Sequence, residues 1–309
     1  MARNSINSRM GPAEWSALVF LSVLWGGSFF FVEIALTQFA PFLIVALRVS
    51  IAALVIWIFV LAKGYAVPRS RSVWAAFFWM GILNNIVPFS LIVWGQTEIA
   101  SGLASILIAA TPIFTVIIAG WLLKDEPIMP AKIIGSVLGL AGVVILIGPS
   151  VVAGLSSNLF AQLAVLAAAL SYAFAGVYGR RFTAMGVNPI VAAAGQLLAS
   201  SIVMLPLVIV LERPFELDAA SVDVWGAVVA LAVLSTALAY VLYFRLLEKV
   251  GATNSVLVTL LIPVTAILLG TAILGERLHA LHFVGIAVIG LGLFVINDSR
   301  ETIDEHFGR

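Results

Sequence analysis

The chain lacks cysteine entirely and has only three histidines and few charged residues among its 309 residues. Without cysteine there is no disulfide framework, no thiolate nucleophile and no thiolate metal site. Charged residues make up 10% of the sequence, against roughly 25% in soluble domains. The net charge of +1, with no basic cluster interleaved with aromatic residues, argues against nucleic acid as a partner.

The motifs of membrane-embedded enzymes are also missing. The sequence contains no H-E-x-x-H pair and no recognisable nucleophile accompanied by a base. Two histidines, His279 and His282, fall in a predicted loop, and His306 falls in the C-terminal tail. Together with Glu276, the loop histidines are the one group that could gather a metal, although loop histidines near a membrane are ordinarily solvated. We expect no catalytic residue, no metal and no cofactor, and therefore no enzyme.

Long apolar runs dominate what is present. Hydrophobic residues make up 62% of the chain and the mean hydropathy is +1.16, whereas soluble domains have roughly 45–50% apolar residues. A run of about 20 apolar residues crosses a bilayer as a helix. Ten runs qualify: Trp15–Leu36, Pro41–Ala62, Val73–Trp94, Ser101–Leu123, Ala131–Ile147, Asn158–Gly179, Pro189–Leu211, Val224–Arg245, Ala252–Leu274 and Ala280–Ile296. We predict an all-α integral membrane protein with ten transmembrane helices.

The first run resembles a signal peptide only in the basic residues that precede it. It continues for about 22 apolar residues without a small-residue cleavage site, so we predict a retained span. The distribution of lysine and arginine then sets the orientation, because these residues stay on the cytoplasmic side. With the N-terminus inside, only Arg213 and Arg277 fall outside, and Arg48 lies within a helix. The cytoplasmic segments hold Arg3, Arg9, Lys63, Arg69, Arg71, Lys124, Lys132, Arg180, Arg181, Arg245, Lys249, Arg300 and Arg309. Both termini are therefore expected in the cytoplasm.

One segment occurs twice in the chain. Residues 101–126 read SGLASILIAATPIFTVIIAGWLLKDE, and residues 252–276 read ATNSVLVTLLIPVTAILLGTAILGE. Each has small residues first, then a proline (Pro112, Pro263) and finally a glutamate (Glu126, Glu276). Two halves of five helices must enter the membrane in opposite senses, which gives inverted repeats and makes alternating access natural. We predict repeats at residues 1–148 and 149–297, followed by a cytoplasmic tail at residues 298–309.

The four longest motifs resemble the EamA-type branch of the drug/metabolite transporter superfamily. They are LWGGSFFFVEIAL in the first helix, PFLIVALRVSIAAL in the second, ATPIFTVIIAGWLLKDE ending the fourth, and GSVLGLAGVVILIG in the fifth. The resemblance covers nearly the whole chain and extends to bacterial amino-acid exporters, including aromatic ones. It implies a secondary transporter in the plasma (inner) membrane, surrounded by lipid and monomeric. Such a protein exports a small-molecule substrate, an amino acid in the first instance, from the cytoplasm through a central cavity.

Other functions stay open at this point. The cargo could be another small metabolite or drug, such as a nucleoside or a cationic compound. A membrane-embedded enzyme or a channel is a more distant alternative. Nothing in the sequence resembles a repeated filter loop or a ring of like charges, and inverted halves favour a carrier over a channel.

Polar side chains at mid-depth are the first candidates for a substrate site, because burial in lipid requires a partner or a water-filled cavity. Asn84 and Asn85 lie near the middle of the third helix, and Ser235 and Thr236 hold the repeat-related positions in the eighth. Such residues also join helices by hydrogen bonds. Neighbouring residues point about 100° apart on a helix, so one packing seam does not account for both Asn84 and Asn85. This favours the cavity.

Aromatic side chains with a polar edge are the second set of candidates. An indole or a phenol offers both a ring face and a hydrogen-bonding group, which suits a substrate with an apolar side chain and a polar group. The set comprises Trp25, Trp79, Tyr172, Tyr178, Tyr240 and Tyr243. Core packing and the interfacial aromatic belt are the alternatives, but Trp25, Tyr172 and Tyr240 lie too deep for the belt.

Glu33 and Arg48 are the charges expected to be buried. We predict an ion pair between them that ties the first two helices together, because an unpaired charge at depth costs several kcal/mol. The alternative is that Arg48 attracts a substrate carboxylate. Gln196, repeat-related to Arg48, keeps a hydrogen-bonding group and is a further cavity candidate. With no other carboxylate at mid-membrane, a proton relay is disfavoured and passive exchange is plausible.

The prolines of the repeated segment are candidate hinges. Each removes an i to i−4 hydrogen bond, which allows a helix to kink. We expect Pro112 and Pro263 to be matched bending points on helices that run in opposite directions. Glu126 and Glu276 are expected to cap these helices on opposite membrane faces.

Overall fold

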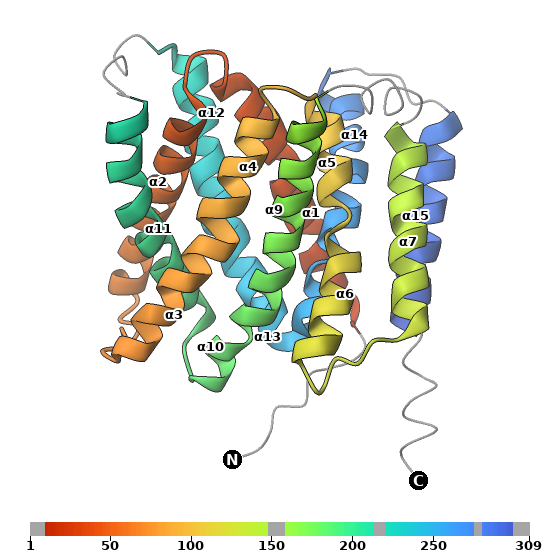
Figure 1. The fold of residues 1–309 in the computed structure, drawn as a ribbon, viewed down its shortest axis with the longest axis horizontal. Helices are drawn as coiled ribbons and strands as arrows, with labels where there is room; N and C mark the ends of the chain where they lie inside the picture. The colour runs from red at the N-terminus through yellow and green to blue at the C-terminus, as the bar shows by residue number, and fades with distance from the viewer. Residues whose placement is uncertain (1–9, 148–157, 213–219, 275–279, 299–309) are drawn as a thin grey trace.

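The computed structural model describes residues 10–147, 158–212, 220–274 and 280–298, and within them every regular element is helical (Figure 1). Nine helical stretches in these residues are long and apolar enough to cross a membrane. A tenth, α14 (Val258–Leu274), has 17 residues. The chain is therefore an all-α, multi-pass membrane protein. The tail at 299–309, with His306, lies outside the described residues, as do Glu276 and His279.

The first half of the chain forms five spans. They consist of α1 (Pro12–Ala35), α2 (Pro41–Ala62), α3 (Arg71–Gly81) continuing through the π-helical turn η1 (Ile82–Ile86) into α4 (Val87–Gly95), α5 (Ser101–Ile108) followed by α6 (Thr111–Leu122), and α7 (Pro130–Ile147). Pro12 and Pro41 occupy the first turns of α1 and α2. A proline costs nothing there, because the first N–H groups of a helix have no partner within the helix.

The second half repeats this order. It consists of α9 (Leu159–Gly179) with the short α10 (Arg181–Ala184), α11 (Pro189–Leu211), α12 (Val222–Ala232) continuing through the π-helical turn η3 (Val233–Leu238) into α13 (Ala239–Ser255), then α14, and finally α15 (Ala280–Asp298). The side chains of Asn158 and Asn188 cap α9 and α11 by accepting hydrogen bonds from backbone N–H groups. The last residues of α13 follow a kink at Gly251, which has a φ of 79°.

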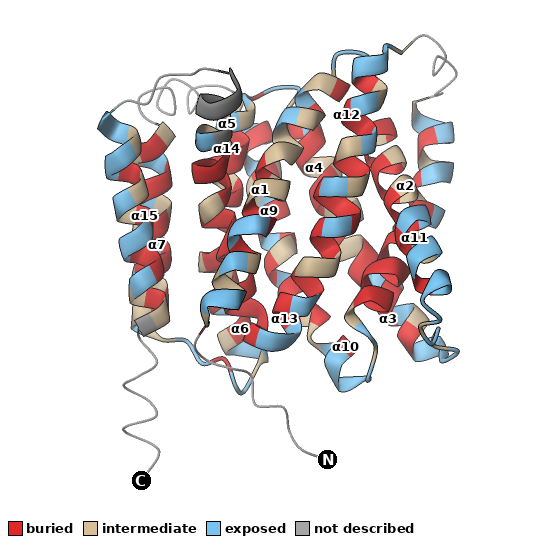
Figure 2. Cartoon of the chain, turned by 180° about the vertical axis from the view of Figure 1, so that it is seen from behind, coloured by how far each residue is buried: buried red, intermediate tan, exposed pale blue. Residues whose placement is uncertain are grey.

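The two halves are interleaved rather than placed side by side. Helix α2 packs against α11, α4 against α9, α1 against α14, and α7 against α15. Buried residues line the inner faces of these helices and exposed residues the outer faces (Figure 2). Many of the exposed side chains are large and apolar, such as Trp121 and Phe160, as expected where lipid replaces water. Any cavity inside this bundle is consequently built from both halves.

Helices α7 and α15 form a closely packed pair at one edge of the molecule (Figure 1). A Cβ atom on Gly135 would lie 2.6 Å from the carbonyl oxygen of Gly292, and a Cβ atom on Gly292 would lie 2.5 Å from that of Gly135. Any larger residue at either position would force the helices apart. Small residues let backbones approach in this way when no hydrophobic force drives association.

Candidate functional site

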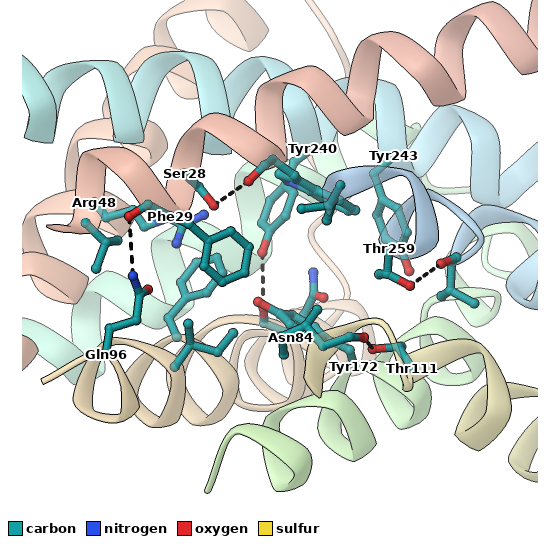
Figure 3. A pocket seen from close by; sticks show the side chains of 17 residues that line it. Ser28, Phe29, Arg48, Asn84, Gln96, Thr111, Tyr172, Tyr240, Tyr243 and Thr259 are labelled. Carbon is teal, nitrogen blue, oxygen red and sulfur yellow. Dashed lines mark hydrogen bonds between the residues drawn. The ribbon is translucent and has the colours of Figure 1, made fainter. Parts of the chain in front are cut away.

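A cavity of about 70 Å³ lies between the two halves, enough for roughly five waters at ~10–15 Å³ each (Figure 3). Its walls come from α1, α2, η1, α4, α5 and α6 of the first half and from α9, α13 and α14 of the second. The lining residues are Trp25, Ser28, Phe29, Val32, Arg48, Asn84, Phe89, Ile92, Gln96, Ile108, Thr111, Tyr172, Tyr240, Tyr243, Val256, Thr259 and Ile262. The cavity is thus largely apolar and aromatic, with a few polar groups.

Five of the predicted cavity residues line this space: Trp25, Asn84, Tyr172, Tyr240 and Tyr243. The Trp25 ring centroid lies 5.5 Å from that of Tyr243 and 6.5 Å from that of Tyr240, to which it stands edge-on. These geometries are typical of favourable aromatic pairs. The aromatic wall is therefore packed and pre-formed.

Four predicted cavity residues do not line it. The Trp79 side chain is 54% exposed on the outside of α3, beside Phe78. Tyr178 lies under the guanidinium of Arg181, 4.1 Å from the ring centroid. Asn85 and Gln196 are fully buried behind the cavity wall. The physical reason is helical rotation: depth along a span does not decide which face a residue occupies.

Several lining residues were missed by the sequence reasoning. Ser28, Phe29 and Val32 lie three, four and seven residues after Trp25, on the same face of α1. That spacing is a usable signal once one residue of the face is known. Phe89, Ile92 and Gln96 show the same spacing along α4 and its end.

A buried hydrogen-bond network lies behind and within the wall. Asn84 donates from Nδ2 to Gln196 Oε1 at 3.1 Å, and Asn85 donates from Nδ2 to Ser200 Oγ at 2.8 Å. The Tyr240 hydroxyl lies 3.0 Å from the carbonyl oxygen of Asn84 and 2.6 Å from Asn85 Oδ1. Asn84 therefore both lines the cavity and joins helices, whereas Asn85 serves packing alone.

The predicted ion pair between Glu33 and Arg48 is wrong. Glu33 is exposed on α1 and accepts a hydrogen bond from Ser101 Oγ at 2.7 Å. Arg48 is buried on α2 and donates from Nε to Thr236 Oγ1 at 2.7 Å. Its guanidinium also lies 3.6 Å from the centroid of the Phe89 ring. The partners of Arg48 are therefore neutral groups of the π-helical turn η3 and the Phe89 ring, and not the predicted carboxylate.

The two candidate hinge prolines occupy different environments. Pro112 lies in the first turn of α6, just after the fourth span breaks at Ala109 and Ala110. Pro263 lies inside the continuous helix α14, whose start follows a break at Val256 and Leu257. The breaks in the two copies of the repeated segment thus fall at different distances from the proline.

A buried carboxylate, that of Glu126, belongs to the segment between α6 and α7, which lies at the lower end of the bundle in Figure 1, the end at which α1 begins and α15 ends. Glu126 accepts hydrogen bonds from the backbone N–H groups of Ala252 and Thr253, both at 2.9 Å, and from Thr253 Oγ1 at 2.5 Å. Arg180 adds a contact from Nη1 at 3.0 Å. We call these four residues the Glu126 clasp. It joins the segment that follows α6 to the ends of α9 and α13.

Among the described residues, no three histidine, aspartate or glutamate side chains come together as a metal site would require. What the site offers is a binding chamber: stacked rings, hydroxyl and amide groups, and a single cation. No lining group is arranged as a nucleophile with its base.

Comparison with known proteins agrees with this architecture. The chain is 26% identical over 283 residues to the uncharacterized inner membrane transporter YedA of Escherichia coli K12, covering 91% of this chain and 90% of that protein. It is 26% identical over 288 residues to an uncharacterized transporter of Archaeoglobus fulgidus, covering 93% and 99%. A solved crystal structure superposes with a TM-score of 0.71 at 23% identity, covering 93% of this chain and 99% of the other, and shares the fold.

These relatives do not show the predicted likeness to amino-acid exporters, because their substrates are uncharacterized. The family model of EamA-like transporters matches twice, at residues 14–148 and 159–298. The two matches correspond to the two halves inferred from the repeated segment. The chain is a multi-pass membrane transporter and not an enzyme, and it belongs to the EamA-like transporter family.

Proposed function

We propose that the protein exports small amphipathic metabolites, with apolar and aromatic amino acids as the first candidates, from the cytoplasm across the inner membrane. The observation that carries this proposal is the cavity between the two halves, whose walls combine packed aromatic rings with a few hydrogen-bonding groups. An amino acid of this kind presents both surfaces at once: a ring or branched chain for the wall and a polar head for the remaining groups.

Alternating access is the proposed mechanism, with both termini in the cytoplasm and the monomer as the working unit. The support is the interleaved arrangement of the halves and the Glu126 clasp, which ties the ends of α9 and α13 to the segment after α6. The proposed movement breaks the clasp and opens the cavity toward the end at which α1 begins and α15 ends. Pro112 and Pro263 remain the proposed hinges of that movement.

A nucleoside or a cationic compound is the alternative cargo. The described lining disfavours a cation, because Arg48 is its one charged side chain and no carboxylate faces the cavity. A channel is disfavoured because the cavity lining is largely apolar and aromatic with one charged side chain, whereas conduction needs a continuous path lined by selective groups.

Counterflow measurements on purified protein in liposomes test the proposal. Liposomes loaded with unlabelled phenylalanine, leucine, a nucleoside or a cationic drug are given the same compound in labelled form. We expect saturable accumulation with the two amino acids. Exchange of the nucleoside or the drug alone would refute the amino-acid assignment and leave the carrier intact, whereas a non-saturating conductance would refute the carrier.

A further inference from the structure

Arg48 is a charged side chain without a charged partner in the middle of a membrane-spanning bundle. It is 5% exposed and is the one ionised group among the 17 residues that line the cavity. The ion pairs among the described residues join Arg180 to Asp125 and Glu126, and Lys249 to Glu14. A cation at this depth is costly unless its charge is compensated, and it marks a functional site by default.

The partners of Arg48 use only part of its hydrogen-bonding capacity. A guanidinium has five N–H donors in a planar fork. Nε donates to Thr236 Oγ1, and Nη2 reaches the carbonyl oxygen of Ser235 at 3.4 Å. The hydroxyl proton of Thr236 is donated to the carbonyl oxygen of Leu231 at 2.8 Å, so its oxygen is left to accept from Arg48. The η3 turn thereby fixes the guanidinium through Nε and Nη2, whereas Nη1 has no hydrogen-bond partner among the described residues and Arg48 lines the cavity.

The surroundings orient the guanidinium without neutralising it. The Phe89 ring covers one of its faces and attracts it electrostatically, but a ring carries no net charge. Figure 3 shows Arg48 and Gln96 toward one end of the cavity, and Thr111 and Thr259 toward the other. Gln96 Oε1 is buried without a hydrogen-bond partner, so this end also holds an unused acceptor.

We propose that Arg48 binds the carboxylate of the transported molecule, so that the substrates are small monocarboxylates with an apolar or aromatic body. This inference rests on the transporter function proposed above and names the substrate class of the same cavity. A guanidinium fork matches a carboxylate with two parallel N–H···O bonds, and such charge-assisted bonds are strong where water is excluded. One cation in a cavity of about 70 Å³ suits a single negative charge and not a phosphate dianion. An amino group beside the carboxylate would find the free oxygen of Gln96.

Matched acid and amide compounds test this assignment on the purified full-length protein. The pairs are L-phenylalanine with L-phenylalaninamide, L-leucine with L-leucinamide, and 3-phenylpropanoate with 3-phenylpropanamide. Binding is measured by ligand-induced thermal stabilisation and by titration calorimetry. We expect the acid of at least one pair to bind about tenfold or more tightly than its amide, because only the acid pairs with the charge.

Substitutions of Arg48 test whether this residue causes the preference for the acid over the amide. Arg48→Gln is expected to abolish the difference between acid and amide, and Arg48→Lys to keep part of it, since lysine retains the charge without the fork. Arg181→Gln is the matched control. Arg181 also stacks on an aromatic ring, that of Tyr178, but is exposed and outside the cavity, so its loss should leave the preference unchanged.

The wild-type comparison holds even if Arg48→Gln fails to fold. Amides that bind as well as their acids would overturn the inference, as would a folded Arg48→Gln protein that keeps the preference, or failure of every acid to bind. None of these results would by itself remove the transporter function. That function fails separately, if no compound in the counterflow panel shows saturable exchange.

Discussion

Tyr240 connects three parts of the bundle through one hydroxyl group. It lies on α13, is 2% exposed, and reaches both the Asn84 carbonyl and Asn85 Oδ1 on η1. Asn85 in turn holds Ser200 on α11. A buried acceptor that loses its donor carries the full cost of its desolvation, so the hydroxyl matters more than its single bond suggests.

Replacing Tyr240 by phenylalanine keeps the ring and removes this donor. We expect Tyr240→Phe to destabilise the folded protein by about 1–3 kcal/mol, because Asn85 Oδ1 is left unsatisfied. The measurement is the thermal unfolding midpoint in detergent. Tyr178→Phe, outside the network, is the control and should unfold at the wild-type temperature. An unchanged midpoint for Tyr240→Phe would show that the hydroxyl has no structural role.

The sequence predicted how deep in the membrane the site residues lie, but not which face of the helix each side chain occupies. Trp25, Asn84 and Tyr240 were identifiable because they are polar or amphipathic at mid-span. Trp79 meets the same criterion, yet it faces outward. A membrane helix is apolar on every side, so the contrast that orients a helix in a soluble protein is absent.

The partners of Arg48 were unpredictable for a different reason. Thr236 lies 188 residues away along the chain, whereas Glu33 is close in sequence and carries the complementary charge. Charge complementarity is visible in a sequence. The approach of η3 to α2 results from the tertiary packing and cannot be predicted from the sequence pattern.

At the scale of elements, the two π-helical turns position the polar groups. Within a π-turn the i to i−4 ladder gives way to i to i−5 bonds, which rotates the residues that follow. η1 carries Asn84 and Asn85, and η3 carries Thr236, the anchor of Arg48. Hydropathy predicted both spans. It could not predict the π-helical turns within them, because one additional residue in a turn leaves the apolar composition of the span unchanged.

The helix boundaries were largely predictable, and the broken spans were not. Residues 41–62 and 189–211 form helices over the predicted range, because each begins at a proline and ends where polar residues follow. The predicted span at residues 101–123 instead divides into α5 and α6. Pro112 indicated that this span could break. The position of the break depends on which groups satisfy the backbone carbonyls that lose their helical hydrogen bonds, and here Thr111 Oγ1 donates to the Ile108 carbonyl oxygen.

The Glu126 clasp leads to a prediction about access to the cavity. Glu126→Gln replaces one carboxylate oxygen by an NH2 group that cannot accept a hydrogen bond, so one of the backbone N–H groups of Ala252 and Thr253 loses its acceptor. We expect the lower end to open more often. Because the chain has no cysteine, Val256→Cys supplies one thiol inside the cavity. Its reaction with a maleimide should be several-fold faster in the Glu126→Gln protein.

Asp125→Asn is the matched control for this labelling experiment. Asp125 also bonds Arg180, but its side chain is 55% exposed, and the Glu126 carboxylate holds the backbone of Ala252 and Thr253. Exposed ion pairs contribute little, so the labelling rate should stay near that of the parent. Equal rates in all three proteins would mean that the clasp does not govern access.

On the scale of the whole molecule, the two copies of the repeated segment share a sequence pattern but not a conformation. The repeated segment breaks at Ala109 and Ala110 in one copy and at Val256 and Leu257 in the other. In a transporter built from inverted repeats, such a difference between halves makes one end of the cavity differ from the other. Exchanging the two conformations would then reverse which end is closed.

The orientation of the molecule is testable directly. The bias of lysine and arginine predicts that both termini lie in the cytoplasm. A fluorescent protein fused to the C-terminus should fluoresce in bacterial cells, whereas alkaline phosphatase at the same position should be inactive. A fusion to the loop between α1 and α2 should give the opposite result. The reverse pattern would place the Glu126 clasp on the external face.

The paired π-helical turns carry information about the ancestry of the chain. η1 and η3 occupy corresponding positions in the two halves, at residues 82–86 and 233–238. Such turns are rare in helices, and each corresponds to one inserted residue. A single insertion that preceded the duplication explains both at once, whereas two independent events would have to strike the same place. A five-helix ancestor would therefore have carried the turn but not the cavity, which helices of both halves of the present chain build.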